Sequence, residues 1–270
     1  MPEPTPVQRI TCENPSPMTL QGTNTYVLGA EQAQQVVIID PGPADHPEHL
    51  AQVRAAVGPR EVSQILVTHR HADHTGAAMS FSEAFAAPVR GFSAQQCIGG
   101  AQGQPASALV DGELIEFGGL QLSVLHTPGH TSDSVCFWLR ANAGDVQQAM
   151  FTGDTILGEG TTMLDHPDGT LTDYLESLRI LSDHVEAELF PAHGPTRPSV
   201  AEVAQSYLAH RLERLDQVRA LLREAGQEGT SLDAEALGSL IYGERGGLPA
   251  GITTKIAAAQ LQHLERLGER

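Results

Sequence analysis

Residues 68–74 read Thr-His-Arg-His-Ala-Asp-His and place three imidazoles and one carboxylate within six positions. The apolar run at residues 65–68, directly before them, is typical of a short buried strand. Residues 75–78, directly after them, are typical of the first turn of a helix. The cluster therefore lies where a strand ends and a helix begins, an edge at which open α/β sheets place their ligands.

This cluster predicts a metal site, with a polar loop that is merely rich in histidine as the alternative. Side chains at alternate positions of an extended chain point the same way, so His69 and His71 can face one ion. Asp73 and His74 follow where the chain turns, and they aim at a neighbouring point. Two adjacent ions use these four groups more easily than one ion does. Imidazole nitrogen and carboxylate oxygen suit zinc, iron or manganese, with zinc as the default.

Three further residues of ligand type stand in matching positions. His130 lies in Thr-Pro-Gly-His-Thr, Asp154 in Phe-Thr-Gly-Asp-Thr, and His193 in Phe-Pro-Ala-His-Gly-Pro. Each follows a short apolar run and is flanked by glycine or proline, which mark tight turns. We therefore expect four strand ends to converge on one rim, each carrying ligands.

Taken together, these seven residues resemble the ligand set of the metallo-β-lactamase superfamily of metal-dependent hydrolases. The resemblance implies an α/β fold, a four-layer αββα sandwich that binds two divalent ions. It implies one ion held by His69, His71 and His130, a second held by Asp73, His74 and His193, and Asp154 bridging them. An aspartate at this bridging position, where some true lactamases have cysteine, is similar to the glyoxalase II-like and nuclease-like branches.

The same resemblance implies how the chemistry is divided. A hydroxide that bridges the two ions would be the nucleophile, oriented by Asp73. One ion would polarise the substrate while the other stabilises the leaving group. Asp40 is expected to orient a ligating histidine, with a strand-end turn as its alternative role. The general acid is either His210 or a metal-bound water.

A narrower resemblance extends over nearly the whole chain. Residues 14–26, 153–162 and 207–214 look like the lactamase-beta-like protein 2 family, whose animal member is a metal-dependent endoribonuclease. The likeness implies a hydrolase that cleaves single-stranded RNA. Ala192 and Leu215 depart from this family, which usually has glycine and glutamate at these positions.

The narrower resemblance also suggests residues that contact the substrate. These are Asn24, Thr161 and Arg211. His210 and Arg211 share one predicted helix, where they could contact an anionic substrate or brace the metal rim. An exposed, ion-paired helix face is the alternative for both residues.

Composition favours a competing substrate. The chain carries 16 Lys and Arg against 33 Asp and Glu, a net charge of −17, so it lacks the overall charge of a nucleic-acid binder. The alternative is a glyoxalase II-like thioesterase, or another acyl hydrolase of a small anionic or carrier-bound substrate. A non-hydrolytic iron protein is a third hypothesis, and it is disfavoured because no flavin-binding or rubredoxin-like segment is evident.

The length of 270 residues suits one large domain with a small appendage. We predict a catalytic domain over residues 1–198 and a C-terminal helical, winged-helix-like module over residues 199–270. The module is expected to cover the pocket, support a homodimer or contact nucleic acid. The longest apolar run, residues 36–39, is too short to span a membrane, and no signal peptide is evident. We therefore expect a cytoplasmic protein that has no membrane partner.

Hydrophobic periodicity predicts the remaining elements. The expected strands cover residues 7–12, 23–28, 35–40, 89–92, 114–117, 120–125, 135–139 and 149–152. The expected helices cover residues 45–57, 75–87, 172–183, 199–226, 232–242 and 252–267. A loop or short helix is expected at residues 94–108. His46 and His49 are expected on the surface, and three unpaired cysteines are expected as reduced thiols outside the metal site: Cys12, Cys97 and Cys136.

Overall fold

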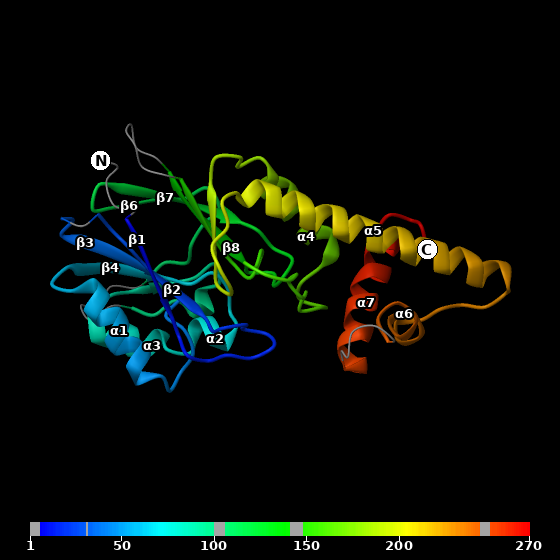
Figure 1. Ribbon diagram of the computed structural model, residues 1–270, viewed down its shortest axis with the longest axis horizontal. Helices are drawn as coiled ribbons and strands as arrows, with labels where there is room; N and C mark the ends of the chain where they lie inside the picture. The colour runs from blue at the N-terminus through cyan, green and yellow to red at the C-terminus, as the bar shows by residue number, and fades with distance from the viewer. Residues whose placement is uncertain (1–5, 31, 100–105, 141–147, 244–248) are drawn as a thin grey trace.

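The computed structural model describes residues 6–30, 32–99, 106–140, 148–243 and 249–270, which form two five-stranded sheets with helices outside them (Figure 1). In spatial order, the first sheet contains β1 (Val7–Thr11), β2 (Asn24–Leu28), β3 (Gln35–Ile39), β4 (Glu61–Leu66) and β5 (Val89–Arg90). The second contains β10 (Glu188–Pro191), β9 (Ala149–Gly153), β8 (Val135–Arg140), β7 (Leu120–His126) and β6 (Leu114–Phe117).

Both sheets are mixed. The pairs β1–β2 and β2–β3 are antiparallel, whereas β3–β4 and β4–β5 are parallel. In the second sheet β6 to β9 pair antiparallel, and β9 pairs with β10 in parallel. The helices are α1 (Pro47–Val57), α2 (Ala72–Thr75), α3 (Ala78–Phe85), α4 (Leu171–Ser182), α5 (Val200–Gln227), α6 (Ala234–Tyr242) and α7 (Ala250–Arg266), with a 3-10 turn at Ala94–Gln96.

The alternation of side chains along each strand builds the layers. On β3, Val37 and Ile39 belong to the apolar cluster between the sheets, while Val36 and Ile38 pack with residues of α1 and α3 on the outside. The outer face of the second sheet packs against α4 and α5. The predicted four-layer αββα sandwich is therefore confirmed, and β3 is apolar from Val36 to Ile39, where both of its faces are covered.

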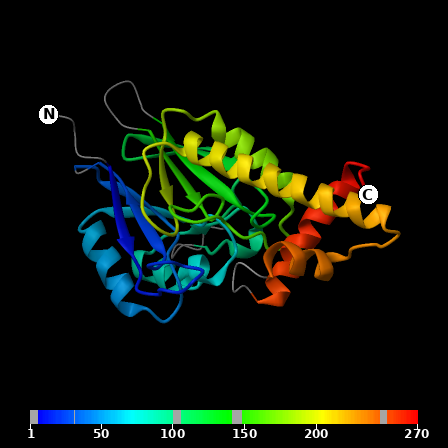
Figure 2. The same cartoon turned by 45° about the vertical axis from the view of Figure 1, so that its right-hand side comes forward.

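The C-terminal helices form one hydrophobic cluster with the sandwich. Leu215 and Val218 of α5, Leu237 of α6 and Leu264 of α7 are fully buried with Tyr174 of α4. In both views α5 leaves the sandwich beside α4, and α6 and α7 pack near its far end (Figures 1 and 2). Within residues 199–243 and 249–270 the structure has helices and no strand, so the likeness to a winged helix is limited to its helices. None of the helices in the described ranges is long and apolar enough to cross a bilayer.

The helix expected over residues 75–87 is interrupted. The chain forms α2 and α3 on either side of Gly76, which packs against the turn after β3: a Cβ atom at Gly76 would lie 2.5 Å from the backbone nitrogen of Ala44. At the other end of the chain α5 continues through Gly226 instead of ending there. Part of the stretch expected as a loop at residues 94–108 lies outside the described residues.

Candidate metal centre

Four turns at one end of the two sheets carry the expected ligands. The histidine loop, residues 68–74, follows β4, and His130, Asp154 and His193 follow β7, β9 and β10. Gly153 brings two of these turns together. Its φ is +51°, and a Cβ atom at Gly153 would lie 2.6 Å from the side chain of Thr68, the first residue of the histidine loop. Only glycine fits such an approach. Asp154 is thereby placed directly against the histidine loop.

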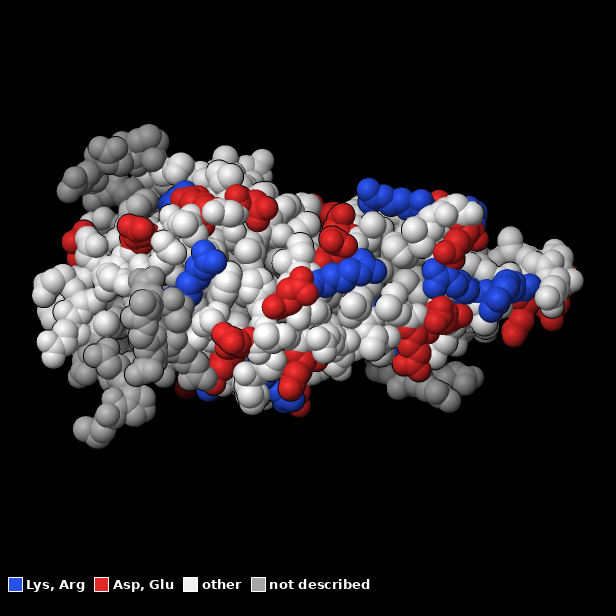
Figure 3. All heavy atoms as spheres, turned by 90° about the horizontal axis from the view of Figure 1, so that it is seen from above, with Lys and Arg blue, Asp and Glu red and all other residues white. Residues whose placement is uncertain are grey.

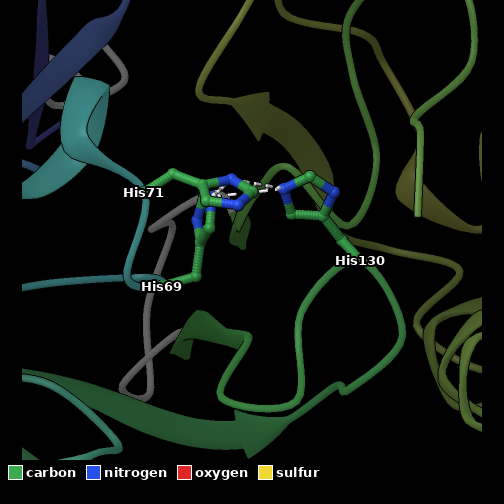
Figure 4. Close-up of side chains that lie close together, drawn as sticks. All are labelled: His69, His71 and His130. Atoms are coloured by element: carbon green, nitrogen blue, oxygen red, sulfur yellow. Dashed lines mark hydrogen bonds between the residues drawn. The ribbon is translucent and has the colours of Figure 1, made fainter. Parts of the chain in front are cut away.

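Three imidazoles converge on one point (Figure 4). His69 Nε2 lies 3.0 Å from His71 Nδ1, and His130 Nε2 lies 3.2 and 3.1 Å from these two atoms. Nitrogens that share one tetrahedral zinc ion through bonds of ~2.0–2.1 Å stand roughly 3.3 Å apart, so the observed spacing fits a common ion.

The other ring nitrogens of two histidines are used elsewhere. His130 Nδ1 donates to the carbonyl oxygen of Met163 at 2.5 Å. His193 Nδ1 donates to the carbonyl oxygen of Gly22 at 3.1 Å. Each ring is thereby fixed with its Nε2 directed inward, and this nitrogen binds a metal once it carries no proton.

A second group of ligand atoms lies beside the first. His193 Nε2 is 3.3 Å from both Asp73 Oδ2 and Asp154 Oδ1. His74 Nε2 is 3.5 Å from the same two oxygens. Asp154 Oδ2 turns the other way and lies 3.6 Å from His130 Nε2. Asp154 therefore stands between the two groups with one oxygen toward each, as expected for a bridging carboxylate.

Two atoms at the centre have no hydrogen-bond partner. Within the described part of the chain, His74 Nε2 and Asp154 Oδ1 are buried and unpartnered. Buried polar atoms of this kind are rare in folded proteins. They lie among donors that fit two cations: the group of His69, His71 and His130, and the group of Asp73, His74 and His193. The donor chemistry and the missing partners both fit a pair of divalent ions.

The two groups differ in charge. Burial lowers the pKa of His69 and His130, which keeps both imidazoles neutral. Burial also opposes the charged form of His193, but the Asp154 carboxylate outweighs it and raises the pKa of His193 to about 9. Burial opposes ionisation of Asp154 as well, yet His193 and His74 hold its pKa well below the ordinary value. The second group is therefore rich in ion pairs.

Asp40 orients the histidine loop from the end of β3. Its Oδ2 accepts a hydrogen bond from His74 Nδ1 at 2.8 Å. The backbone N–H and the hydroxyl of Thr68 also donate to this carboxylate, each at 2.8 Å. This is the contact expected for Asp40. It leaves Nε2 of His74 free to face the other ligand atoms of the second group, those of Asp73 and His193.

His49 is buried, which corrects the expectation that it lies on the surface. Its Nε2 bonds the hydroxyl of Thr25 at 2.7 Å, and that hydroxyl donates to the carbonyl oxygen of Asp40 at 2.5 Å. Asp40 has a φ of +51°, a conformation that non-glycine residues rarely adopt. His49 therefore helps to hold Asp40 in place. The sequence around His49 does not reveal this hydroxyl partner, which lies 24 positions away.

Replacing Asp40 with asparagine is expected to weaken metal affinity about 10–100-fold, the usual cost of losing a partner that orients a ligating histidine. The new amide NH₂ would face donors on His74 and Thr68. Competition with a chromophoric chelator measures the affinity. Asp45→Asn is the matched control, because Asp45 also has a positive φ, +61°, but is exposed. Wild-type affinity in Asp40→Asn would contradict the orienting role.

Asn24 supports the site instead of contacting substrate, which corrects the role expected for it. Its amide Nδ2 donates to the carbonyl oxygens of Pro191 and Gly194 at 2.9 and 3.0 Å. Its Oδ1 accepts from the hydroxyl of Thr11 at 2.7 Å. The residue is 2% exposed. Both amide hydrogens are thus committed to the turn that presents His193.

A pocket of about 340 Å³ opens onto Asp154 and His130. Thr161, His210 and Arg211, the other residues expected near substrate, also line it. The rest of the lining is largely apolar, and it comes from the N-terminal loop, the loop after β9, α4 and α7: Leu20, Leu157, Met163, Leu164, Leu171, Ile252, Ile256 and Ala259. The structure therefore brings these three residues to the same cavity as the metal-binding side chains.

Sequence reasoning missed a group of ion pairs that ties the histidine loop to the loop before α4. Arg70 pairs with Asp165 at 2.5 Å and also with Asp168. Asp165 Oδ2 lies 3.3 Å from His71 Nε2, the ring nitrogen that faces away from the other histidines. The partners lie 95 and 98 positions away, so spacing alone could not select them.

The chain belongs to the metallo-beta-lactamase superfamily, whose family model matches residues 18–193. The matched region contains all seven residues of the candidate centre. The paired sheets and the position of these residues at their common end agree with this membership. The protein is therefore a hydrolytic enzyme, and its fold implies that it binds divalent metal.

Two relatives and one solved structure show what the chain is similar to. It is 31% identical over 233 residues to the Beta-lactamase-like protein 2 homolog of Caenorhabditis elegans, which covers 84% of this chain and 74% of that protein. It is 30% identical over 266 residues to the Atrochrysone carboxyl ACP thioesterase of Aspergillus chevalieri, with 98% and 82% covered. A metallo-beta-lactamase family protein from Thermus thermophilus shares the fold, with a TM-score of 0.74, 22% identity, and 97% and 94% covered.

Proposed function

We propose that this enzyme hydrolyses acyl thioesters, using two divalent metal ions held by the seven residues of the candidate centre. The observation that carries the proposal is the pocket of about 340 Å³, which adjoins Asp154 and has mainly apolar walls. Its volume lies within the range of small-molecule sites, ~300–1,000 Å³. Apolar walls favour burial of a hydrocarbon acyl chain, at roughly 25 cal/mol per Å² of apolar surface removed from water.

The charge on the protein supports a small substrate over a polynucleotide. The net charge is −17. On the face seen in Figure 3, basic and acidic side chains alternate along α5. Proteins that track single strands combine a continuous basic groove with aromatic side chains for stacking. Of the described residues that line the pocket, Tyr242 is the only phenylalanine, tyrosine or tryptophan that could stack on a base. These features favour an acyl substrate.

Single-stranded RNA is the second candidate, and one observation favours it. His210, Arg211 and Arg214 line the pocket from one helix and could contact a phosphate. The likeness to the Beta-lactamase-like protein 2 homolog covers most of the chain. Against this, Arg211 already donates to the carbonyl oxygen of Thr162 and lies 5.3 Å from the ring of Tyr174. These contacts indicate that Arg211 braces the pocket wall.

The bound ions would supply a water activated at neutral pH and positive charge beside the scissile carbonyl, and zinc, iron and manganese all suit these donors. Asp73 lines the mouth of the site, and its side chain is 30% exposed. We assign to Asp73 the orientation of the attacking water. His74, His130 and His193 keep their Nε2 atoms directed inward through the Nδ1 contacts described above.

The protonation state of His210 fits hydrolysis of a thioester better than hydrolysis of a phosphodiester. Burial, with the neighbouring Arg211 and Arg214, lowers the pKa of His210, so its imidazole is neutral at pH 7. A neutral imidazole is a weak acid. A thiolate leaves without strong acid assistance because thiols have a pKa near ~8.5. His210 is then a hydrogen-bonding group for the substrate, and the need for a general acid disappears.

We further propose that residues 199–270 act as the pocket wall of the catalytic domain, residues 1–198. Helices α5, α6 and α7 contribute eight of the lining residues: His210, Arg211, Arg214, Tyr242, Ile252, Ile256, Ala259 and Gln260. A homodimer and contact with nucleic acid are the alternative roles for these helices. Their position beside Asp154 supports a role in shaping the substrate site.

Metal-loaded protein should be assayed side by side on hexanoyl-N-acetylcysteamine thioester and on a short fluorescent single-stranded RNA, each with and without EDTA. We expect thioester hydrolysis that EDTA abolishes and that changes little with salt, and we expect intact RNA. Affinity for a phosphate polymer falls steeply with salt, which separates the two substrates. Chelator-sensitive RNA cleavage without thioester hydrolysis would overturn the proposal.

A further inference from the structure

The substrate pocket has a polar group among its apolar walls. Gln260 of α7 and Tyr242 of α6 both line it. Gln260 is 5% exposed, and its Nε2 donates to the hydroxyl oxygen of Tyr242 at 3.0 Å. Its Oε1 is buried and has no hydrogen-bond partner in the described ranges. A buried amide oxygen without a partner is costly, so a ligand atom that satisfies it gains affinity.

We propose that Gln260 and Tyr242 recognise a hydroxyl group on the acyl chain of the substrate. The inference rests on the proposed thioester hydrolysis, and it narrows the substrate class to hydroxylated acyl thioesters. A hydroxyl can donate to Gln260 Oε1 and accept from the Tyr242 hydroxyl at the same time. Burial raises the pKa of Tyr242, which keeps this phenol protonated as a donor.

Other polar groups fit this position less well. A carboxylate would set its own lone pairs against the bare Oε1 of Gln260. An ammonium group has no lone pair with which to accept from the Tyr242 hydroxyl. An unsubstituted hydrocarbon would leave Oε1 without a partner. A neutral group that both donates and accepts meets all three conditions.

The test uses matched pairs of N-acetylcysteamine thioesters over a graded series of chain lengths, one member of each pair carrying a terminal hydroxyl. With metal-loaded protein we expect kcat/KM to favour the hydroxylated member about tenfold at the length that reaches Gln260. Gln260→Leu should erase or reverse this preference, and Tyr242→Phe should reduce it. Gln262→Leu is the matched control on the same helix, because Gln262 is exposed and should keep the preference.

A second readout separates this inference from the proposed function. Calorimetry compares the affinity of each variant for the matched product acids, with and without the hydroxyl, and needs no turnover. If no thioester is cleaved, the proposed function fails, while tighter binding of the hydroxy acid through Gln260 would still support the inference. Equal kcat/KM and equal affinity within every pair, or a preference that survives Gln260→Leu, would overturn it. A thermal melt of each variant verifies folding.

Discussion

Replacing Asp154 with alanine should lower kcat by about 10³-fold or more and reduce the bound metal from two ions per chain to one or fewer. Asp154 directs one oxygen toward each group of ligand atoms, 3.3 Å from His193 Nε2 and 3.6 Å from His130 Nε2. Its loss therefore affects both ions at once. Loss of a single charge-stabilising group already costs ~10²–10³-fold in other hydrolases. Elemental analysis and single-turnover kinetics measure the two effects.

The control for this variant is Asp216→Ala. Asp216 lies on α5, its side chain is 76% exposed, and it pairs with Arg219 three positions away. Exposed pairs of this kind contribute ~0–1 kcal/mol to stability, so both activity and metal content should remain near wild type. Full activity in Asp154→Ala would show that the nucleophile is generated elsewhere and that the candidate centre is misassigned.

Removing the metal with a chelator should lower the thermal midpoint by about 10 °C. A ligand present at a thousand times its Kd stabilises the folded state by ~4 kcal/mol. For a chain of this size each kcal/mol shifts the midpoint by about 2–4 °C. Without the ions, His74 Nε2 and Asp154 Oδ1 remain buried without a hydrogen bond. Scanning calorimetry before and after dialysis against EDTA measures the shift.

Restoring zinc should recover the midpoint, which distinguishes metal loss from irreversible damage. Asp154→Ala should show a smaller shift on chelation than wild type, since it binds less metal at the start. An unchanged midpoint, together with metal detected in the dialysate, would mean that the ions leave without affecting the fold. The seven residues would then form a stable site even when empty, and the unpartnered atoms would not need a metal partner.

The candidate metal centre could be assembled from the sequence because each of its parts obeys a local rule. Asp154 and His193 each follow a short apolar strand and stand beside glycine, so strand, turn and ligand can be recognised within a few residues. The two sheets could be predicted in the same way, from short apolar runs such as that of β3. The break at Gly76 was missed because it depends on contact with a turn that is remote in sequence.

The roles of the residues around the centre were harder to predict from the sequence, because the groups they contact are far away along the chain. Asn24 uses its amide on carbonyl groups 167 and 170 positions away, so its supporting role could not be separated from a substrate contact. His49 was placed on the surface because helical periodicity does not reveal a hydroxyl partner on a neighbouring strand. Gln260 looks like any other glutamine of an amphipathic helix. Its significance lies in the packing of α6 against α7 around the pocket.

The composition of the pocket wall has a consequence for how such enzymes diverge. All seven residues of the centre precede residue 194, whereas eight lining residues follow residue 200. Substitutions in α5, α6 and α7 can therefore alter which substrate fits the pocket and leave the seven residues of the centre unchanged. Exchanging these helices between relatives should transfer acyl preference while the hydrolytic apparatus stays intact. We therefore expect a change of substrate to begin with substitutions in these three helices, in the last quarter of the chain.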